Sequence, residues 1–286
     1  MSSIKLRAVV ALSGLALVCA AQAAPKEAAP KKPAAHAKKA ADAVAADFEK
    51  FHEIMEEDSP AELFEAKGKE LWHARRGPKK VSLEKCDLGL GPGVLKGAYV
   101  QMPRYFADAG EVMDAERRIV YCMVKQQGYD FKDLAKKPFS KGSYTPDLVS
   151  LVTYVAGQSR GMKIAVPQKL PQERAAYEIG REIFNYRAGP YDFSCSTCHG
   201  ADGMRIRTQN LPNLTSKTDA ARGFVGWPGY RMTGGVMITL QWRMNDCFRQ
   251  QRFPEPEYAS QAISDLLTYI GANANGHLYK GPGIKR

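Results

Sequence analysis

The residues with the clearest chemistry form the segment Cys195-Ser196-Thr197-Cys198-His199. In this pattern two thiols bond covalently to the vinyl groups of a haem while the adjacent histidine binds the iron. A redox Cys-x-x-Cys pair and half of a zinc site are the alternatives, but the sequence has no second Cys/His pair with zinc spacing. We therefore predict one covalent haem c, attached through Cys195 and Cys198 and ligated by His199.

The N-terminus has the features of an export signal. An apolar stretch at 8–21 follows Lys5 and Arg7, and Ala21-Gln22-Ala23 supplies a small-x-small cleavage site. The stretch is shorter than the roughly 20 residues a bilayer span requires. We expect a signal peptide at 1–23, a periplasmic protein and no membrane span. Cys19 follows the bulky Val18, so a lipid anchor is the lesser alternative.

Composition places the remainder among globular proteins. The 286 residues are 44% hydrophobic and 25% charged, which excludes a wholly disordered chain. More than half of the net charge of +11 lies in residues 1–41, and 24–46 reads as an Ala/Lys/Pro-rich tether. A basic leader of this kind is more often solvated than bound to nucleic acid. We therefore predict no nucleic-acid partner.

The sequence repeats itself in three blocks that keep the same order. Such blocks predict a duplicated domain, with a haemless cytochrome c-like unit at 47–165 and a haem c-binding unit at 166–286. At an offset of 112, Gly68, Glu70, Arg75, Gly77, Pro78 and Cys86 match Gly180, Glu182, Arg187, Gly189, Pro190 and Cys198. At 125, Pro103, Tyr105, Gly110, Arg118 and Cys122 match Pro228, Tyr230, Gly235, Arg243 and Cys247. At 115, the segment 147–155 matches 262–270.

Hydrophobic spacing predicts a mainly α fold, which the repeat and the haem motif divide into two tandem cytochrome c-like domains. Ala61–Arg75 and Glu173–Tyr186 are amphipathic, and the segments ending near Tyr154 and Tyr269 have apolar residues at helical intervals. No strand alternation persists along the chain. The Gly-, Pro- and Asn-rich stretch Gly200–Pro228 is expected to form long loops that wrap the cofactor.

Two cysteines of the first half are expected to pair. Leu83 and Asp87 stand where the second half has a thioether cysteine and the iron-binding histidine, so the first half cannot hold haem c in the usual way. Cys86 and Cys122 are then left inside one domain of an exported protein. A disulfide is the simplest outcome, and two free thiols are the alternative.

Cys247 remains unpaired and matches Cys122 in the repeat, which places it near the haem. A soft thiolate is a competent second axial ligand for iron. We favour Cys247 in this role. The alternative ligands are Met232, Met237 and Met244, with Cys247 as an inert buried thiol.

Arg243 precedes Cys247 by four residues, so a helix over 242–250 puts both side chains on one face. Arginine presents a planar fork to an oxyanion and stabilises a neighbouring thiolate. The pair is thus a candidate anion site beside a thiolate. A haem-propionate or surface arginine is the alternative.

Several segments resemble the SoxA family of sulfur-oxidising c-type cytochromes. They are Cys86-Asp-Leu-Gly-Leu-Gly-Pro-Gly-Val, Pro103-Arg-Tyr-Phe, Cys195-Ser-Thr-Cys-His-Gly and Trp242-Arg-Met-Asn-Asp-Cys247-Phe. The resemblance extends from Ala61 to Ile270. It implies a heterodimer with the small cytochrome SoxX and an L-cysteine S-thiosulfotransferase activity that joins thiosulfate to a cysteine of the carrier SoxYZ.

The resemblance also assigns roles to single residues. It implies that Cys247 is the second axial ligand, often carried as a persulfide, and that Arg243 lies in the active site. Leu83 and Asp87 depart from members with two haems in this subunit. The chain resembles instead the members with one haem and a disulfide in place of the other.

The chemistry itself predicts a second redox centre. Coupling a thiol to the outer sulfur of thiosulfate releases two electrons, whereas one haem stores one, so a partner cytochrome is expected. The competing hypothesis is a plain electron-transfer cytochrome with a methionine ligand, and a purely structural haem-binding module is a third class. Cys247 discriminates among them, because neither alternative has a use for an odd thiol with an arginine at helical spacing.

Overall fold

The computed structural model describes residues 50, 54, 59–206 and 209–285 of the 286-residue chain. The signal peptide predicted at 1–23, the tether predicted at 24–46 and Cys19 lie outside these residues. None of the helices within the described ranges is both long and apolar enough to cross a bilayer.

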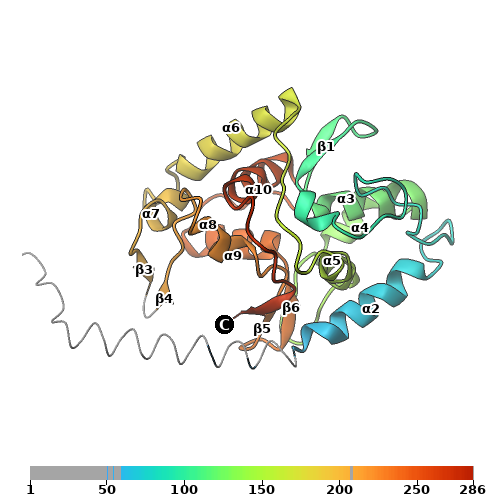
Figure 1. The fold of residues 1–286 in the computed structure, drawn as a ribbon. Helices are drawn as coiled ribbons and strands as arrows, with labels where there is room; N and C mark the ends of the chain where they lie inside the picture. The colour runs from blue at the N-terminus through green and yellow to red at the C-terminus, as the bar shows by residue number, and fades with distance from the viewer. Residues whose placement is uncertain (1–49, 51–53, 55–58, 207–208, 286) are drawn as a thin grey trace, which may run out of the picture. The chain divides into compact units, whose positions relative to one another are not determined.

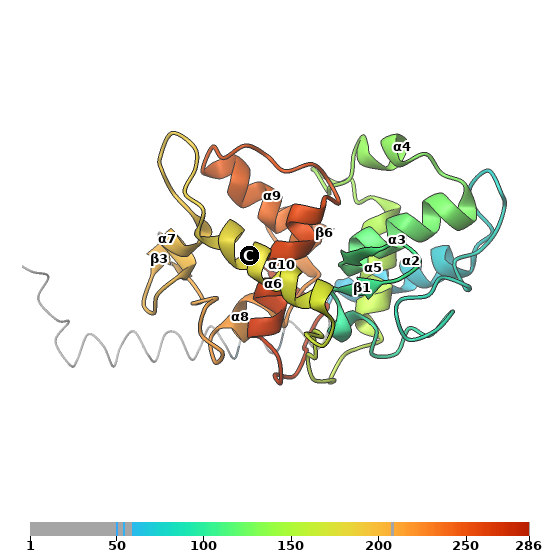
Figure 2. The same ribbon diagram turned by 90° about the horizontal axis from the view of Figure 1, so that it is seen from above.

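Two pairs of long helices frame the fold. Helix α2 (Ala61–His73) packs on α5 (Asp147–Gly157), and α6 (Pro171–Asn185) packs on α10 (Gln261–Asn273), as Figures 1 and 2 show. All four helices were predicted from the apolar spacing and are confirmed. Their ends differ from the prediction by at most three residues.

Each pair crosses closely because a glycine lies at the crossing. A Cβ on Gly68 of α2 would overlap the backbone carbonyl oxygen of Ser150 on α5. A Cβ on Gly180 of α6 would overlap the carbonyl oxygen of Asp265 on α10 in the same way. The two glycines match each other in the sequence repeat. In both halves, therefore, a glycine allows the first long helix to cross closely over the last one.

The start of α6 follows directly from its sequence. Pro171 occupies the first helical position, where its missing N–H costs no hydrogen bond. The carboxylate of Glu173 accepts hydrogen bonds from the backbone N–H groups of Lys169 and Leu170, at 3.0 and 3.1 Å. These contacts fix the entry into α6, which leads to the Cys195 segment.

The chain also forms short strands, although the sequence predicted none. Strand β1 (Arg104–Phe106) pairs antiparallel with β2 (Glu111–Met113), and β5 (Gly229–Arg231) pairs antiparallel with β6 (Val236–Ile238). Strand β7 (Gly283–Lys285) adds to β5 in parallel. Each strand has only three residues, too few to show an alternating pattern in the sequence.

A helix leaves each of the two equivalent hairpins. The 3-10 turn η1 (Tyr99–Gln101) precedes β1, and α3 (Ala115–Cys122), the π-helical segment η2 (Met123–Gln127) and α4 (Phe131–Ala135) follow β2. Helix α9 (Leu240–Gln250) follows β6. Asp114 caps α3 by accepting from two backbone N–H groups, and the Thr239 hydroxyl caps α9 by accepting from the Trp242 N–H.

The segment predicted as loops is only partly irregular. It contains the hairpin of β3 (Arg205–Ile206) and β4 (Gln209–Asn210) and the short helix α8 (Ala220–Phe224). The prediction of long loops over 200–228 was therefore correct only in part. Two-residue strands and a single helical turn leave no periodic signal to detect.

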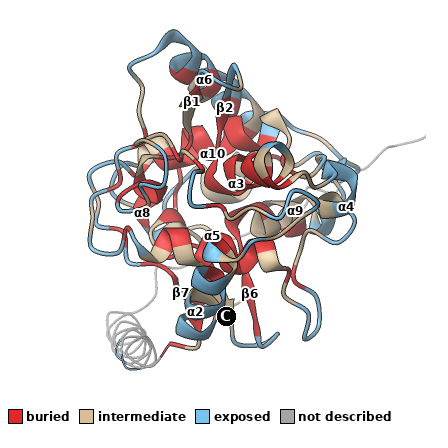
Figure 3. Cartoon of the chain, turned by 90° about the vertical axis from the view of Figure 1, so that its right-hand side faces the viewer, coloured by how far each residue is buried: buried red, intermediate tan, exposed pale blue. Residues whose placement is uncertain are grey.

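The two halves share one principal hydrophobic core. Trp72 and Leu151 from the first half belong to the same buried cluster as Phe184 and Leu266 from the second. Figure 3 shows buried residues concentrated on α3, α5 and α10. The boundary at 165/166 stays a prediction from the repeat.

Candidate functional site

The Cys195 segment forms a single helical turn, α7 (Cys195–His199). Its first turn is fixed by Ser194, whose hydroxyl accepts a hydrogen bond from the Thr197 backbone N–H at 3.2 Å. The Thr197 hydroxyl in return accepts from the Ser194 backbone N–H at 3.0 Å. This reciprocal cap holds the two cysteines, both free of disulfides and half-buried, on one short turn.

The imidazole of His199 is prepared as a ligand. Its Nδ1 lies 2.9 Å from the carbonyl oxygen of Pro212. A carbonyl oxygen can only accept, so Nδ1 carries the proton and Nε2 of the neutral ring keeps its lone pair. Burial lowers the pKa of His199, the Pro212 contact opposes this, and the charge of Arg243 lowers the pKa further. The neutral, metal-binding form is therefore the favoured one.

Helix α9 carries both Arg243 and Cys247, as predicted from their spacing. The two side chains lie on one face, one turn apart. Burial raises the pKa of the Cys247 thiol, the charge of Arg243 opposes the rise, and Asp246 and Cys198 add to it. Arg243 thus provides the positive charge that favours a thiolate at this position.

Among the described residues, the three cysteines outside the disulfide lie within electrostatic reach of one another. Burial raises the pKa of Cys195 to about 12, and the neighbouring Cys247 raises it as well. Cys198 in turn raises the pKa of Cys247. The fold therefore brings α9 to α7, although forty residues of sequence separate the two helices.

These residues fit a covalently attached haem c. Two free thiols share one turn, a neutral imidazole offers Nε2, and a further thiol approaches from another helix. In the described part of the chain no group of three His, Cys, Asp or Glu side chains converges as around a bare ion. The donor set suits an iron whose equatorial ligands come from a porphyrin.

The methionines considered as alternative ligands lie in different surroundings. Met237 is fully buried in a small cluster with Ala61 and Val149, apart from the cluster that Cys195 joins. The side chain of Met232 is 41% exposed. Met244 lies on α9 and packs against the principal core.

In the first half, the positions that the repeat matches to Cys198, Cys247 and Arg243 are occupied by a disulfide and a buried arginine. Cys86 and Cys122 form a disulfide with an S–S distance of 2.02 Å, which confirms the predicted pair. Arg118, the repeat partner of Arg243, is 3% exposed, and its Nε donates to the Asp87 carbonyl oxygen at 2.7 Å. Its Nη1 donates to both carboxylate oxygens of Asp108. This arginine is structural.

Two contacts at the site were not anticipated from the sequence. The Pro212 carbonyl that orients His199 lies 13 residues away, and no pattern marks a backbone acceptor. Asp246 contacts Arg243 at 3.1 Å between its Oδ2 and Nη1. Its position three residues after Arg243 is an ion-pair spacing on a helix, which was a usable signal.

Comparison with known proteins is decisive for the family. The L-cysteine S-thiosulfotransferase subunit SoxA of Hydrogenophilus thermoluteolus is 46% identical over 239 residues, covering 84% of this chain and 87% of that protein. The chain belongs to the SoxA family. The SoxA subunit of Paracoccus pantotrophus is more distant, with 26% identity over 80% of this chain and 72% of its own length.

Two further comparisons locate the likeness to SoxA. The family described as SoxA/TsdA, cytochrome c domain, matches residues 67–164, which include the disulfide-bonded half. A crystal structure of SoxXA from P. pantotrophus superposes with a TM-score of 0.64 and 26% identity, covering 80% of each chain. The fold is therefore the helical cytochrome c-like fold of SoxA.

Proposed function

We propose that this chain is an L-cysteine S-thiosulfotransferase subunit that oxidatively couples thiosulfate to a cysteine of a SoxYZ-type carrier protein. The observation that carries the proposal is the placement of Arg243 and Cys247 one turn apart on α9, beside the α7 thiols. The names of the SoxA relatives support the same activity.

The cofactor of the proposal is one haem c in this subunit. Cys195 and Cys198 would attach the haem through thioethers, and His199 and Cys247 would hold its iron. When bound, the haem would serve as a one-electron acceptor. The first half supports a single haem, because its disulfide and Arg118 occupy the positions that the repeat pairs with Cys198, Cys247 and Arg243.

The coupling reaction can be written with atoms and electrons balanced. The Cys247 thiolate and the outer sulfur of thiosulfate form an S–S bond, and two electrons leave. The thiolate of the carrier cysteine then attacks that outer sulfur and takes the thiosulfonate group. The bond to Cys247 breaks, and its sulfur departs with the electron pair as a thiolate. A persulfide of Cys247 would act in the same manner with one more sulfur.

Arg243 binds the sulfonate group in this scheme. Its guanidinium side chain is 39% exposed and so reaches solvent, where a small dianion can approach it. The charge of Arg243 also lowers the pKa of Cys247 and so offsets part of the rise that burial causes. One side chain thus positions the substrate and supports the nucleophile.

Two electrons require two one-electron centres, so we propose a small c-type cytochrome of the SoxX kind as heterodimer partner. The similarity to the SoxXA crystal structure supports this partner. We further propose that the chain is exported to the periplasm after cleavage near Ala23, where thiols can be oxidised. Its two tandem domains would derive from one cytochrome c-like ancestor, with the first having lost its haem.

The test is electron paramagnetic resonance of the oxidised, periplasmically matured holoprotein, read together with its optical spectrum. We expect a low-spin histidine/thiolate signal that disappears in Cys247→Met, together with loss of thiosulfate coupling. A methionine-type far-red band in the unmodified protein would contradict the proposal. It would indicate a plain electron-transfer cytochrome with Met232, Met237 or Met244 as ligand. Full coupling activity in Cys247→Ala would also contradict the proposal.

A further inference from the structure

Asp246 is a buried carboxylate between the two residues of the proposed site. Its side chain is 8% exposed. Its Oδ2 accepts from Arg243 Nη1 at 3.1 Å and from Gln250 Nε2 at 2.7 Å. Its Oδ1 accepts from Arg249 Nη2 at 2.7 Å. All three donors come from the same helix, so the cluster is assembled as soon as α9 forms.

The contact uses only one end of the Arg243 guanidinium. Among the described residues, Asp246 is the sole hydrogen-bond acceptor of this side chain, and it takes Nη1. The Nε and Nη2 donors are left for another partner, and the side chain is 39% exposed. A guanidinium has five N–H donors in a rigid fork, so holding one end still permits a paired contact with two oxygens.

The repeat supplies an internal comparison. Arg118 occupies the position of Arg243 in the first half, but Asp108 and the Asp87 carbonyl take its donors and its side chain is 3% exposed. It also stacks on Phe106, with 4.0 Å from the guanidinium carbon to the ring centre. The position equivalent to Asp246 is Tyr121. The first half therefore lacks the aspartate at this position, and its arginine at the position of Arg243 is buried instead of open to solvent.

We propose that Asp246 is a positioning residue: its carboxylate holds the Nη1 end of Arg243 so that the remaining donors bind the sulfonate oxygens of thiosulfate. The inference rests on the proposed function and adds a residue to it. Arg249 pairs with the other oxygen of Asp246, so the carboxylate keeps a cationic partner when Arg243 engages the substrate. A freely rotating arginine would lose side-chain entropy on binding, and Asp246 removes that loss in advance.

The test compares thiosulfate affinity in four forms of the matured heterodimer, without carrier, by titration calorimetry. Asp246→Asn keeps the shape and removes the charge, and we expect about tenfold weaker binding, as for Arg243→Gln. Because Asp246 acts through Arg243, the double variant should be no weaker than Arg243→Gln alone. The low-spin spectrum should be unchanged in Asp246→Asn, since the axial ligands remain.

Matched controls separate positioning from structure. Glu178→Gln removes another i,i+3 pair with arginine in the same half, on α6, and should leave affinity unchanged. Asp246→Glu retains the charge one methylene further out. Its thiosulfate affinity should fall about threefold, between the affinities of the unmodified protein and Asp246→Asn. If Asp246→Asn does not fold, Asp246→Glu provides the affinity comparison with Arg243→Gln.

The outcomes distinguish this inference from the proposed function. Unchanged affinity in both Asp246 variants, or additive losses in the double variant, overturns the positioning role while leaving Arg243 as the anion site. Unchanged affinity in Arg243→Gln, or no thiosulfate binding to the unmodified heterodimer, overturns the proposed anion site and the positioning role with it.

Discussion

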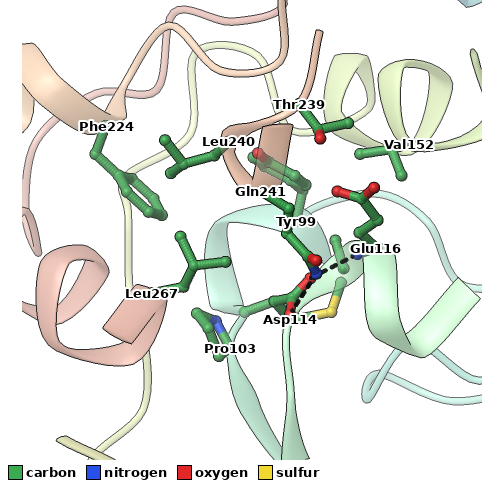
Figure 4. Close-up of a pocket in the computed structure, with 12 residues that line it drawn as sticks. Tyr99, Pro103, Asp114, Glu116, Val152, Phe224, Thr239, Leu240, Gln241 and Leu267 are labelled. Carbon is green, nitrogen blue, oxygen red and sulfur yellow. Dashed lines mark hydrogen bonds between the residues drawn. The ribbon is translucent and has the colours of Figure 1, made fainter. Parts of the chain in front are cut away.

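Gln241, at the start of α9, donates its side-chain amide to both carboxylate oxygens of Asp114, at 2.9 and 3.1 Å. Asp114 caps α3 and Thr239 caps α9, and the two caps are equivalent in the repeat. Thr239 in turn hydrogen-bonds Glu116, the equivalent of Gln241. Each of the two residues therefore caps its own helix and also contacts a side chain of the other helix, beside a pocket of about 30 Å³ (Figure 4).

The buried Glu116 predicts a pH dependence of stability. Burial, with a further contribution from the charge of Asp114, raises its pKa from 4.5 to about 8, and hydrogen bonds from Thr239 and Tyr258 oppose the rise. The folded protein then binds one more proton than the unfolded chain between these values. Stability must fall as pH rises through that window and level off above about 8.

Glu116→Gln replaces the protonated carboxyl with a neutral group of the same shape. In urea unfolding of the holoprotein, we expect the native protein to lose roughly 2 to 4 kcal/mol between pH 5 and pH 8 through this residue. The variant should lack that part of the decrease. The other polar groups facing Glu116 are Asp114, Thr239 and the hydroxyls of Tyr99 and Tyr258, all retained in both proteins. An equal decrease in both proteins would mean that Glu116 is not the titrating group.

The disulfide of the first half predicts a loss of stability without a change at the haem site. Cys86 and Cys122 are buried and close a loop of sequence separation 36. Replacing both by alanine should cost roughly 3 to 4 kcal/mol in the free energy of unfolding, because the unfolded chain gains freedom. The oxidised spectrum should not change, since His199 and Cys247 lie in the other half. Denaturant unfolding and the optical spectrum check the two parts, and a shifted spectrum would contradict the separation of roles.

The sequence predicted the features whose residues carry covalent or packing constraints. The motif at Cys195–His199 has a fixed chemical spacing, and long helices such as α2 and α6 carry apolar residues at helical intervals. The short hairpins escaped prediction because their strands have only three residues each, and the pairing of β5 with β7 escaped because it joins residues more than fifty positions apart. The Asp114–Gln241 contact escaped for a related reason. An aspartate before a helix predicts a local cap, and nothing local announces a second role at an interface.

The methionine alternatives give the last prediction, because their surroundings differ from those of Cys247. Met237 has no exposed surface and packs with Ala61 and Val149, outside the cluster that contains Cys195. Met237→Leu conserves volume, so the fold should lose less than about 1.5 kcal/mol and the oxidised spectrum should stay the same. Met244→Leu on α9 should also leave the spectrum unchanged, whereas Cys247→Met replaces thiolate by thioether sulfur and alters it. Electron paramagnetic resonance of the three matured variants makes the comparison. Loss of the native signal in Met237→Leu or Met244→Leu, with Cys247→Met unchanged, would assign the second axial position to methionine.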